Sequence, residues 1–219
     1  MYLPAHFAMD DKASILTILR DYPLATLVYQ DQHEFQAEHL PCVYQPAAIA
    51  ANWGSLFCHA AIGNRLVELA SAAGTDQGLP ILAIFQGPSA YVTPSWYEDK
   101  VKTGEVVPTY NYAVVHVYGR LRLITDTQEF AAKLALLSDH FEQSREKAWR
   151  MDDAPAEFLQ QIMQAIAGLD IQIERVVGKA KMSQNKTSFD RQTIADGLRA
   201  EGAAAVSEIM EQQLFAATT

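Results

Sequence analysis

The chain has 219 residues, of which 49% are hydrophobic and 20% charged, and its formal net charge is −9. This length allows one large domain or two small ones, and the acidic balance argues against broad nucleic-acid binding, which needs a clustered positive surface. No apolar run has the length of a membrane span, and the N-terminus lacks the basic and apolar regions of a secretory signal, so we expect a cytoplasmic protein. The two cysteines, Cys42 and Cys58, provide neither a disulfide framework nor a zinc cluster.

The first half of the chain combines β-forming segments with two short helices. Asp10 is a suitable N-cap for a helix that runs to about Arg20. A second helix is expected from residue 63 to a stop at Gly74. A buried strand at 80–86 is expected to end at the Gly87-Pro88 pair, before the segment 89–96. The other expected strands are 24–30, 35–44, where Pro41 indicates an edge or a bulge, and 54–60.

The second half begins with an expected loop at 98–111 and then becomes more regular. We expect strands at 112–124 and 169–178, and helices from Asp126 or Thr127 to about Lys147, at 154–168 with a stop at glycine, and in the tail at 188–214. About seven mostly antiparallel strands with helices at their ends favour an α+β barrel-like domain over a doubly wound sheet. We expect a domain at 1–187, with the helical tail 188–219 packed on it.

Common nucleotide-binding and hydrolase motifs are absent. The sequence has no GxGxxG, no GxxxxGK[ST] and no GxSxG. His39, His59 and His116 lie in expected strands, without paired carboxylates at ligand spacing. We therefore expect no metal site.

A strand ends and a helix begins around Gly63-Asn64. A helix N-terminus offers free N–H groups and a partial positive charge, which suit a phosphate, and Arg65 adds a cation that can bind phosphate through two hydrogen bonds. The alternative is a simple cap beside a solvated arginine.

Aromatic and amide side chains gather in two segments, 85–97 and 107–119. The first carries Tyr91, Trp96 and Tyr97, and the second carries Tyr110, Asn111 and Tyr112. Such side chains suit a flat heterocycle, with stacking on its faces and amides at its edges. The alternative is an aromatic core with a loop.

The segment 175–191 holds five basic residues and one acid, Asp190, in an otherwise acidic chain. It contains the stretch KAKMSQNKT at 179–187. Three interpretations are open: a solvated turn, an anion site for a phosphate-bearing ligand, and a contact with nucleic acid.

Six blocks in order carry a family resemblance: MYLPAHF, HLP, GN, FQGPSAYVTPSWY, VPTYNYAVVHVYG and KMSQNK. Together they resemble the PaiB family of FMN-binding negative transcriptional regulators, which belongs with the FMN-binding split barrels related to pyridoxamine phosphate oxidase. The likeness runs from Met1 to about residue 200. It implies a split β-barrel and a homodimer with FMN held at the subunit interface.

The resemblance also implies cofactor-binding residues. On the second strand these are Glu38, His39, Leu40 and Pro41, which would line the isoalloxazine. Cys58 and His59 would lie near the flavin, and Asn64 and Arg65 would face its phosphate. Some relatives have Gly-Asn-Pro in place of Gly63-Asn64-Arg65. Further contacts implied are Gln86, Tyr110 and Asn111 (the last two from the partner subunit), and the terminal signature Lys181, Ser183, Gln184 and Asn185.

Three functions are compatible with this sequence: a PaiB-like regulator that binds FMN, an FMN-dependent oxidoreductase acting on a small molecule, and a module for haem or another cofactor. The resemblance implies DNA as a partner, but the charges of the tail do not support it. The tail carries Glu201, Glu208 and Glu211 against Arg199, and it shows no helix-turn-helix pattern. With a flavin as the expected partner, the stretch 179–187 is interpreted as a polar hook at the end of a barrel strand. Lys181 supplies its cation, while Lys179 and Lys186 are solvated.

Overall fold

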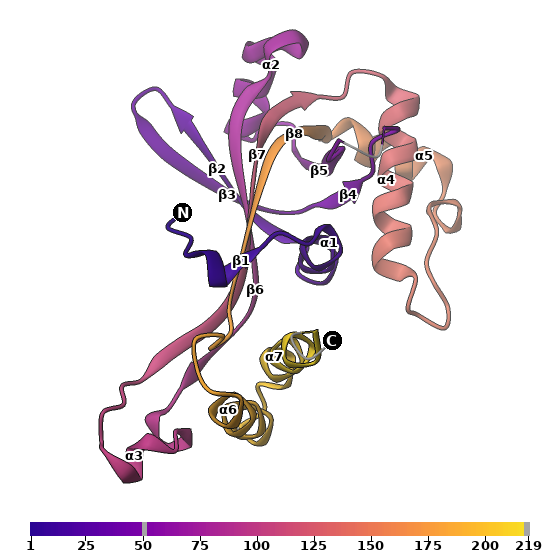
Figure 1. The fold of residues 1–219 in the computed structure, drawn as a ribbon. Coiled ribbons are helices and arrows are strands. Elements are labelled where there is room, and N and C mark those ends of the chain that lie inside the picture. Colours follow the sequence, from indigo (N-terminus) through magenta and orange to yellow (C-terminus); the bar gives the residue numbers. More distant parts are fainter. Residues whose placement is uncertain (50–51, 217–219) are drawn as a thin grey trace. The chain divides into compact units, whose positions relative to one another are not determined.

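Eight strands form a mostly antiparallel sheet in the part of the chain that the structure describes, residues 1–49 and 52–216 of a computed structural model (Figure 1). The strands are β1 (Ala8–Met9), β2 (Leu24–Asp31), β3 (Glu34–Pro41), β4 (Val43–Gln45), β5 (Ser55–Ala61), β6 (Leu79–Val92), β7 (Thr109–Leu123) and β8 (Ile166–Lys181). Their order in the sheet is β3-β2-β6-β7-β8-β5-β4, and β1 pairs with β8.

Helices connect and follow these strands. They are α1 (Lys12–Asp21), α2 (Arg65–Gln77), α3 (Asp99–Lys102), α4 (Thr127–Glu142), α5 (Ala156–Gln164), α6 (Ser188–Ala200) and α7 (Ala204–Ala216), together with the short 3-10 helices η1 (Ala5–Phe7), η2 (Pro94–Trp96) and η3 (Met151–Asp153). None of the described helices is long and apolar enough to cross a membrane.

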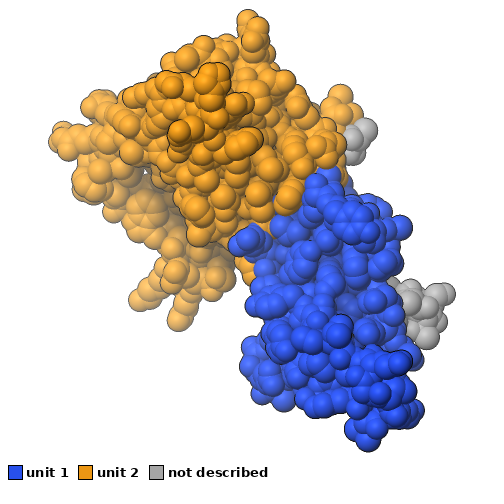
Figure 2. Space-filling view, turned by 90° about the vertical axis from the view of Figure 1, so that its left-hand side faces the viewer, with its two compact units in different colours: residues 1–18, 86–115, 177–219 blue, residues 19–85, 116–176 orange. Residues whose placement is uncertain are grey.

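The chain divides into two compact units (Figure 2). Unit 1 contains residues 1–18, 86–115 and those from 177 onward, and unit 2 contains residues 19–85 and 116–176. Strands β6, β7 and β8 each begin in one unit and end in the other. Helices α6 and α7, which lie in the expected tail, belong to unit 1, and the division at residue 187 stays a prediction.

Alternate residues of β2 and β6 build the core of unit 2. The antiparallel register pairs Leu27 with Ala83, and both side chains are completely buried. Helix α4 adds Phe130 and Leu137, which pack with Phe57 of β5 in one cluster. The period-two pattern of the strands and the helical spacing on α4 both follow from the sequence.

In unit 1 the helices α6 and α7 pack together and bury a line of apolar side chains. Ile194, Leu198 and Met210 are almost completely inaccessible to solvent. Gly197 of α6 lies against the indole ring of Trp96, where a Cβ atom would come within 2.3 Å of the ring. Glycine is therefore required at this position by packing.

Two predicted boundaries are wrong, one at the cap of a helix and one inside a strand. Asp11, and not Asp10, caps α1, since its carboxylate accepts hydrogen bonds from the amides of Ser14 and Ala13. Strand β6 continues through Gly87-Pro88, where glycine admits the side chain of Ala113 at 3.2 Å from a hypothetical Cβ.

Other corrections concern glycines and helix ends. Gly168 lies inside β8, because the ring of Phe130 fills the space of a side chain, at 2.5 Å from a hypothetical Cβ. Gly74 has φ of 72° and kinks α2, but the helix resumes and its C-cap is Gly78. Helix α4 ends at Glu142 and the expected loop 98–111 contains α3. The tail forms two helices instead of one, with Gly202 at φ of 86° between them.

Candidate functional site

The predicted site residues fall into two groups, one in each unit, and each group has its own geometry. In unit 2 they lie on β3, on β5 and at the start of α2. In unit 1 they lie on β6, on β7 and after the end of β8.

One face of the unit 2 sheet is apolar but only partly covered. Val28 of β2 pairs with Leu82 of the neighbouring strand β6 and with Ala37 of the neighbouring strand β3, so these three side chains lie on the same face of the sheet. Val28 and Leu82 are half-buried, while Phe35 on the same face is 82% exposed. We call this side of β3, β2 and β6 the open face, because on the opposite side Ala25, Leu27 and Ala83 are completely buried.

The four consecutive residues predicted on β3 do not share a face. Glu38 pairs with Leu27 and Leu40 pairs with Ala25, so their side chains lie on the core side and are half-buried. His39 pairs with Thr26 on the open face, and Pro41 follows two residues later on the same side. A flavin on the open face would therefore contact the side chains of His39 and Pro41.

Cys58 and His59 lie near the end of β5. The Cys58 side chain is completely buried, whereas His59 is half-buried. The Nδ1 atom of His59 is buried and has no hydrogen-bond partner among the described residues. Burial lowers the pKa of His59, so its imidazole is neutral at neutral pH and offers an unused hydrogen-bonding atom.

The start of α2 has the geometry that the sequence predicts. The side chain of Asn64 caps the helix by accepting a hydrogen bond of 2.8 Å from the amide of Leu66. Arg65 donates through Nε and a terminal nitrogen to both carboxylate oxygens of Asp31, at 2.8 and 2.9 Å, and to Glu68 at 2.8 Å. These acceptors raise the pKa of Arg65 and use three of the five N–H groups of its guanidinium, so a phosphate would share the cation with two carboxylates.

In unit 1 a lysine bridges two strands. The ammonium of Lys181, at the end of β8, donates to the hydroxyl of Thr109 and, at 2.9 Å, to the carbonyl oxygen of Tyr110 on β7. Both acceptors are neutral, and no ion pair joins Lys181 to a described carboxylate. Burial lowers the pKa of Lys181. The side chain is thus a cation held in place without a counter-charge.

The side-chain amides of Asn111 and Gln184 form hydrogen bonds with other groups of the protein. Asn111 is completely buried, accepts a hydrogen bond of 3.0 Å from the Ser183 hydroxyl and donates to the sulfur of Met210 at 3.3 Å. Ser183 has φ of 59°, in the left-handed region. Gln184 joins the amide of Met182 to the carbonyl of Ala180. These contacts fix the turn that follows β8.

Three further predicted residues are exposed. Gln86 on β6, Tyr110 on β7 and Asn185 in the turn all present their side chains to solvent. Of the other two lysines in the stretch, Lys179 is buried and lies over the ring of Tyr112, which corrects the expectation that it is solvated. Lys186 is half-buried, 4.5 Å from the ring centroid of Tyr97.

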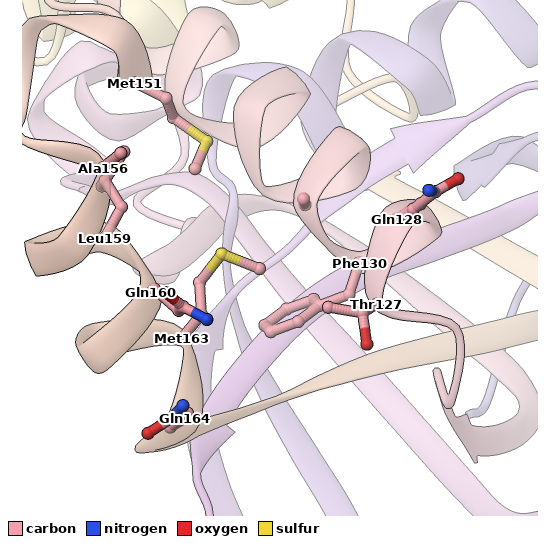
Figure 3. A pocket seen from close by; sticks show the side chains of 10 residues that line it. Thr127, Gln128, Phe130, Met151, Ala156, Leu159, Gln160, Met163 and Gln164 are labelled. Carbon is pink, nitrogen blue, oxygen red and sulfur yellow. The ribbon is translucent and has the colours of Figure 1, made fainter.

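A separate pocket of about 620 Å³ lies between α4 and α5 in unit 2 (Figure 3). Figure 3 shows Met151, Met163 and Phe130 projecting toward it from η3, α5 and α4. Its other lining residues are Thr127, Gln128, Ala131, Ala156, Leu159, Gln160 and Gln164, so no charged side chain lines it. The pocket suits an uncharged apolar group and not a phosphate.

The sequence does not indicate which residues accept the hydrogen bonds of Arg65 and Lys181. Asp31 lies 34 positions from Arg65, and Thr109 lies 72 positions from Lys181. The adjacency of β7 and β8 in the sheet brings Thr109 to Lys181, and the placement of the start of α2 beside the end of β2 brings Arg65 to Asp31. Among the described residues no group of three or more His, Cys, Asp or Glu side chains is arranged to hold a metal ion.

Comparison with known proteins adds independent information. Residues 1–175 match the family described as "Putative FMN-binding domain". A Bacillus subtilis (strain 168) protein named Protease synthase and sporulation protein PAI 2 is 28% identical over 217 residues, which cover 98% of both chains. An uncharacterized protein of Emericella nidulans is 33% identical over 226 residues, 90% of each chain. Among solved structures, the flavocytochrome Anf3 of Azotobacter vinelandii has a TM-score of 0.59 at 16% identity, over 85% of this chain and 75% of that chain.

These findings confirm three expectations from the sequence. The resemblance to the PaiB family is confirmed, as is the α+β fold of the FMN-binding split β-barrels. FMN is confirmed as the cofactor. The individual flavin contacts stay predictions.

Proposed function

This chain belongs to the family of FMN-binding domains that its residues 1–175 match, and on that premise we propose that it works as a homodimer with FMN on the open face of unit 2. The observation that carries this proposal is the apolar character of both faces of β2 and β6. Strands that are apolar on both sides are typical of sheets covered on both sides. Val28 and Leu82 of the open face are only half-buried in the single chain, which leaves room for a flavin and a second copy.

The side chains available on unit 2 fit the chemical parts of FMN. A planar ring can rest on the open face beside His39 and Pro41, with the neutral imidazole of His59 as a hydrogen-bonding group. Asn64 and Arg65 offer a helix N-terminus and a planar cation to the phosphate. FMN, when bound, supplies electron-transfer chemistry, and the protein binds and orients it.

The unit 1 group has a place in the same proposal. The resemblance assigns Tyr110 and Asn111 to the flavin bound by the partner subunit. Lys181 hydrogen-bonds to Tyr110, and Ser183 to Asn111, so these four residues would act together. A dimer would then use both groups at each flavin.

Of the roles that such a protein can have, we favour an FMN-dependent redox or sensing role over direct contact with DNA. In the described tail Arg199 is paired with Asp196 and with Glu211, so its charge is already neutralised. Transcriptional regulation remains the role implied by resemblance. Haem binding remains the other alternative, and a visible spectrum separates haem from flavin.

A flavin titration tests the cofactor site. The purified protein is expected to quench the fluorescence of FMN with one flavin per chain, and to bind riboflavin, which lacks the phosphate, at least about tenfold more weakly. A protein that binds neither compound would refute the proposal. Equal affinity for both would refute the phosphate contacts alone.

The oligomeric state is tested by light scattering after size-exclusion chromatography. Phe35→Ser removes a side chain that is 82% exposed on the open face, so it should dissociate the dimer without unfolding the chain. The matched control is Phe158→Ser on α5, where the aromatic side chain is 52% exposed. A wild-type monomer in the presence of saturating FMN would exclude the homodimer.

A further inference from the structure

Cys42 and Cys58 face each other across neighbouring strands of unit 2. Strand β4 pairs with β5 in antiparallel register, with Val43 opposite Phe57. Continuing this register by one residue places Cys42 directly opposite Cys58. Residues opposite each other in an antiparallel pair have Cα atoms about 4.5–5.5 Å apart, which lies inside the range that a disulfide bridges.

The two side chains are also oriented for contact. Residues directly opposite share one side of the sheet, and both cysteines are free thiols with exposures of 1% and 0%. The hydrogen bond between the two thiols, together with burial, raises the pKa of Cys42. The thiol of Cys42 also lies 3.5 Å from the carbonyl oxygen of Leu40. The two thiols are therefore adjacent and shielded from solvent, and that of Cys42 is protonated.

We propose that Cys42 and Cys58 are a reversible oxidation site, at which an intramolecular disulfide joins the start of β4 to β5. A low-molecular-weight disulfide is the oxidant. One cysteine sulfur attacks it and releases one small thiol, and the second cysteine sulfur then displaces the other small thiol. The protein loses two protons and two electrons, and the reagent becomes two thiols.

The surroundings of the pair set the rate of this reaction. Buried, protonated thiols react slowly, because the thiolate is the attacking species. Strand β4 has three residues and stands at the end of the strand order, so local opening of this short edge exposes the thiols. We therefore expect slow oxidation in buffer and faster oxidation at urea concentrations below the unfolding transition.

The position of the pair gives the disulfide a consequence. Pro41 precedes Cys42, and His59 follows Cys58, and both are candidate flavin contacts. A disulfide would fix these two segments relative to each other. The inference goes beyond the proposed function and does not depend on it, since the register of β4 and β5 alone supports it.

Peptide mass decides the question directly. The chain has no lysine or arginine between Arg20 and Arg65, so trypsin leaves both cysteines on the peptide 21–65. After incubation with oxidised glutathione and alkylation of the remaining thiols, this peptide is expected without alkylation and about 2 Da lighter than its reduced form, having lost two hydrogens. Dithiothreitol should restore two alkylated cysteines.

Three results would overturn the inference: two alkylated cysteines after prolonged oxidation, a stable glutathione adduct on the wild-type peptide, or a disulfide between two chains. The matched variants Cys42→Ser and Cys58→Ser cannot form the intramolecular bond, and each should take up one glutathione instead. If either variant fails to fold, the wild-type peptide still gives the answer. Because the measurement works with or without FMN, its failure is distinct from a failure to bind flavin.

Discussion

Lys133 of α4 donates a hydrogen bond of 2.6 Å to Asp170 of β8, and both side chains are at least four-fifths buried, with exposures of 16% and 12%. Asp170 also accepts from the hydroxyl of Ser55 at 2.9 Å and from the amide of Gln172 at 2.6 Å. This polar group ties the helix to two strands of unit 2. A buried carboxylate tolerates its position only while such donors and the neighbouring cation are present.

Lys133→Met keeps most of the side-chain volume but removes the cation, so it should lower the free energy of unfolding by about 3–5 kcal/mol. Chemical denaturation measures this loss. The control is Glu129→Gln, because Glu129 also contacts Lys133, at 3.4 Å, but is 53% exposed. The control should change stability by less than about 1 kcal/mol. Equal effects of the two substitutions would show that burial does not determine the strength of this ion pair.

Gly197→Ala should destabilise unit 1 although alanine is the better helix former. In an exposed helix the exchange gains about 1 kcal/mol, but here the new Cβ would lie 2.3 Å from the ring of Trp96. Thermal unfolding should therefore give a lower midpoint for this variant. Gly63→Ala, in the turn before α2, is a control that adds a Cβ without a steric contact, since nothing lies within 4 Å of its hypothetical Cβ. A midpoint at or above that of the wild type for Gly197→Ala would contradict the close contact.

Much of the framework of this molecule can be read from its sequence. The alternation in β7 predicts buried and half-buried faces, and Asp126 is recognisable as the N-cap of α4, where its side chain accepts from the amide of Glu129 at 2.8 Å. Both signals are local, because they depend on neighbours in the chain. The sequence likewise predicts the strand β3, apart from its end.

The failures come from contacts distant in sequence. Gly87 reads as a break, but its place is set by close packing against Ala113 in the interior of a long strand. Arg65 reads as a free cation, because nothing in the sequence indicates that Asp31 will lie beside it. Cys42 and Cys58 read as unrelated residues, since only the pairing of β4 with β5 places them opposite each other.

The pair of Asp31 and Arg65 should make stability depend on pH. The hydrogen bond from Arg65 lowers the pKa of Asp31. A carboxyl group with a lowered pKa in the folded state contributes its stabilisation above its unfolded value of about 3.9, and loses it as the pH falls through the folded value. The stability advantage of wild type over Asp31→Asn should therefore be full at about pH 6 and vanish toward about pH 2.

Denaturant unfolding at a series of pH values measures this difference. In an Arg65→Met background the same comparison should lose its dependence on pH in this window, because the cation that lowers the pKa is gone. Asp31→Asn should also strengthen FMN binding if Arg65 contacts the phosphate, since a competing acceptor is removed. Weaker FMN binding in Asp31→Asn would argue that the carboxylate positions Arg65 and does not compete for it.

The last prediction separates two roles of Lys181. Its ammonium has two neutral acceptors, Thr109 and the Tyr110 carbonyl, and can still attract an anionic ligand. Lys181→Ala should weaken FMN binding by about tenfold, which corresponds to one charge-assisted hydrogen bond. Quenching of flavin fluorescence measures the affinity, and denaturation of the same samples measures stability. Lys186→Ala is the control, because it removes a nearby cation that lies over Tyr97.

The combination of the two measurements decides between the roles. A ligand-binding role predicts a loss of FMN affinity in Lys181→Ala that exceeds the loss in Lys186→Ala. A purely structural role predicts lower stability with unchanged affinity, because the ammonium would then serve only to join the ends of β7 and β8. Riboflavin gives a further distinction, since a contact to the phosphate should leave riboflavin affinity unchanged in Lys181→Ala. Equal losses for FMN and riboflavin would place the contact of Lys181 at the ring or sugar chain and not at the phosphate.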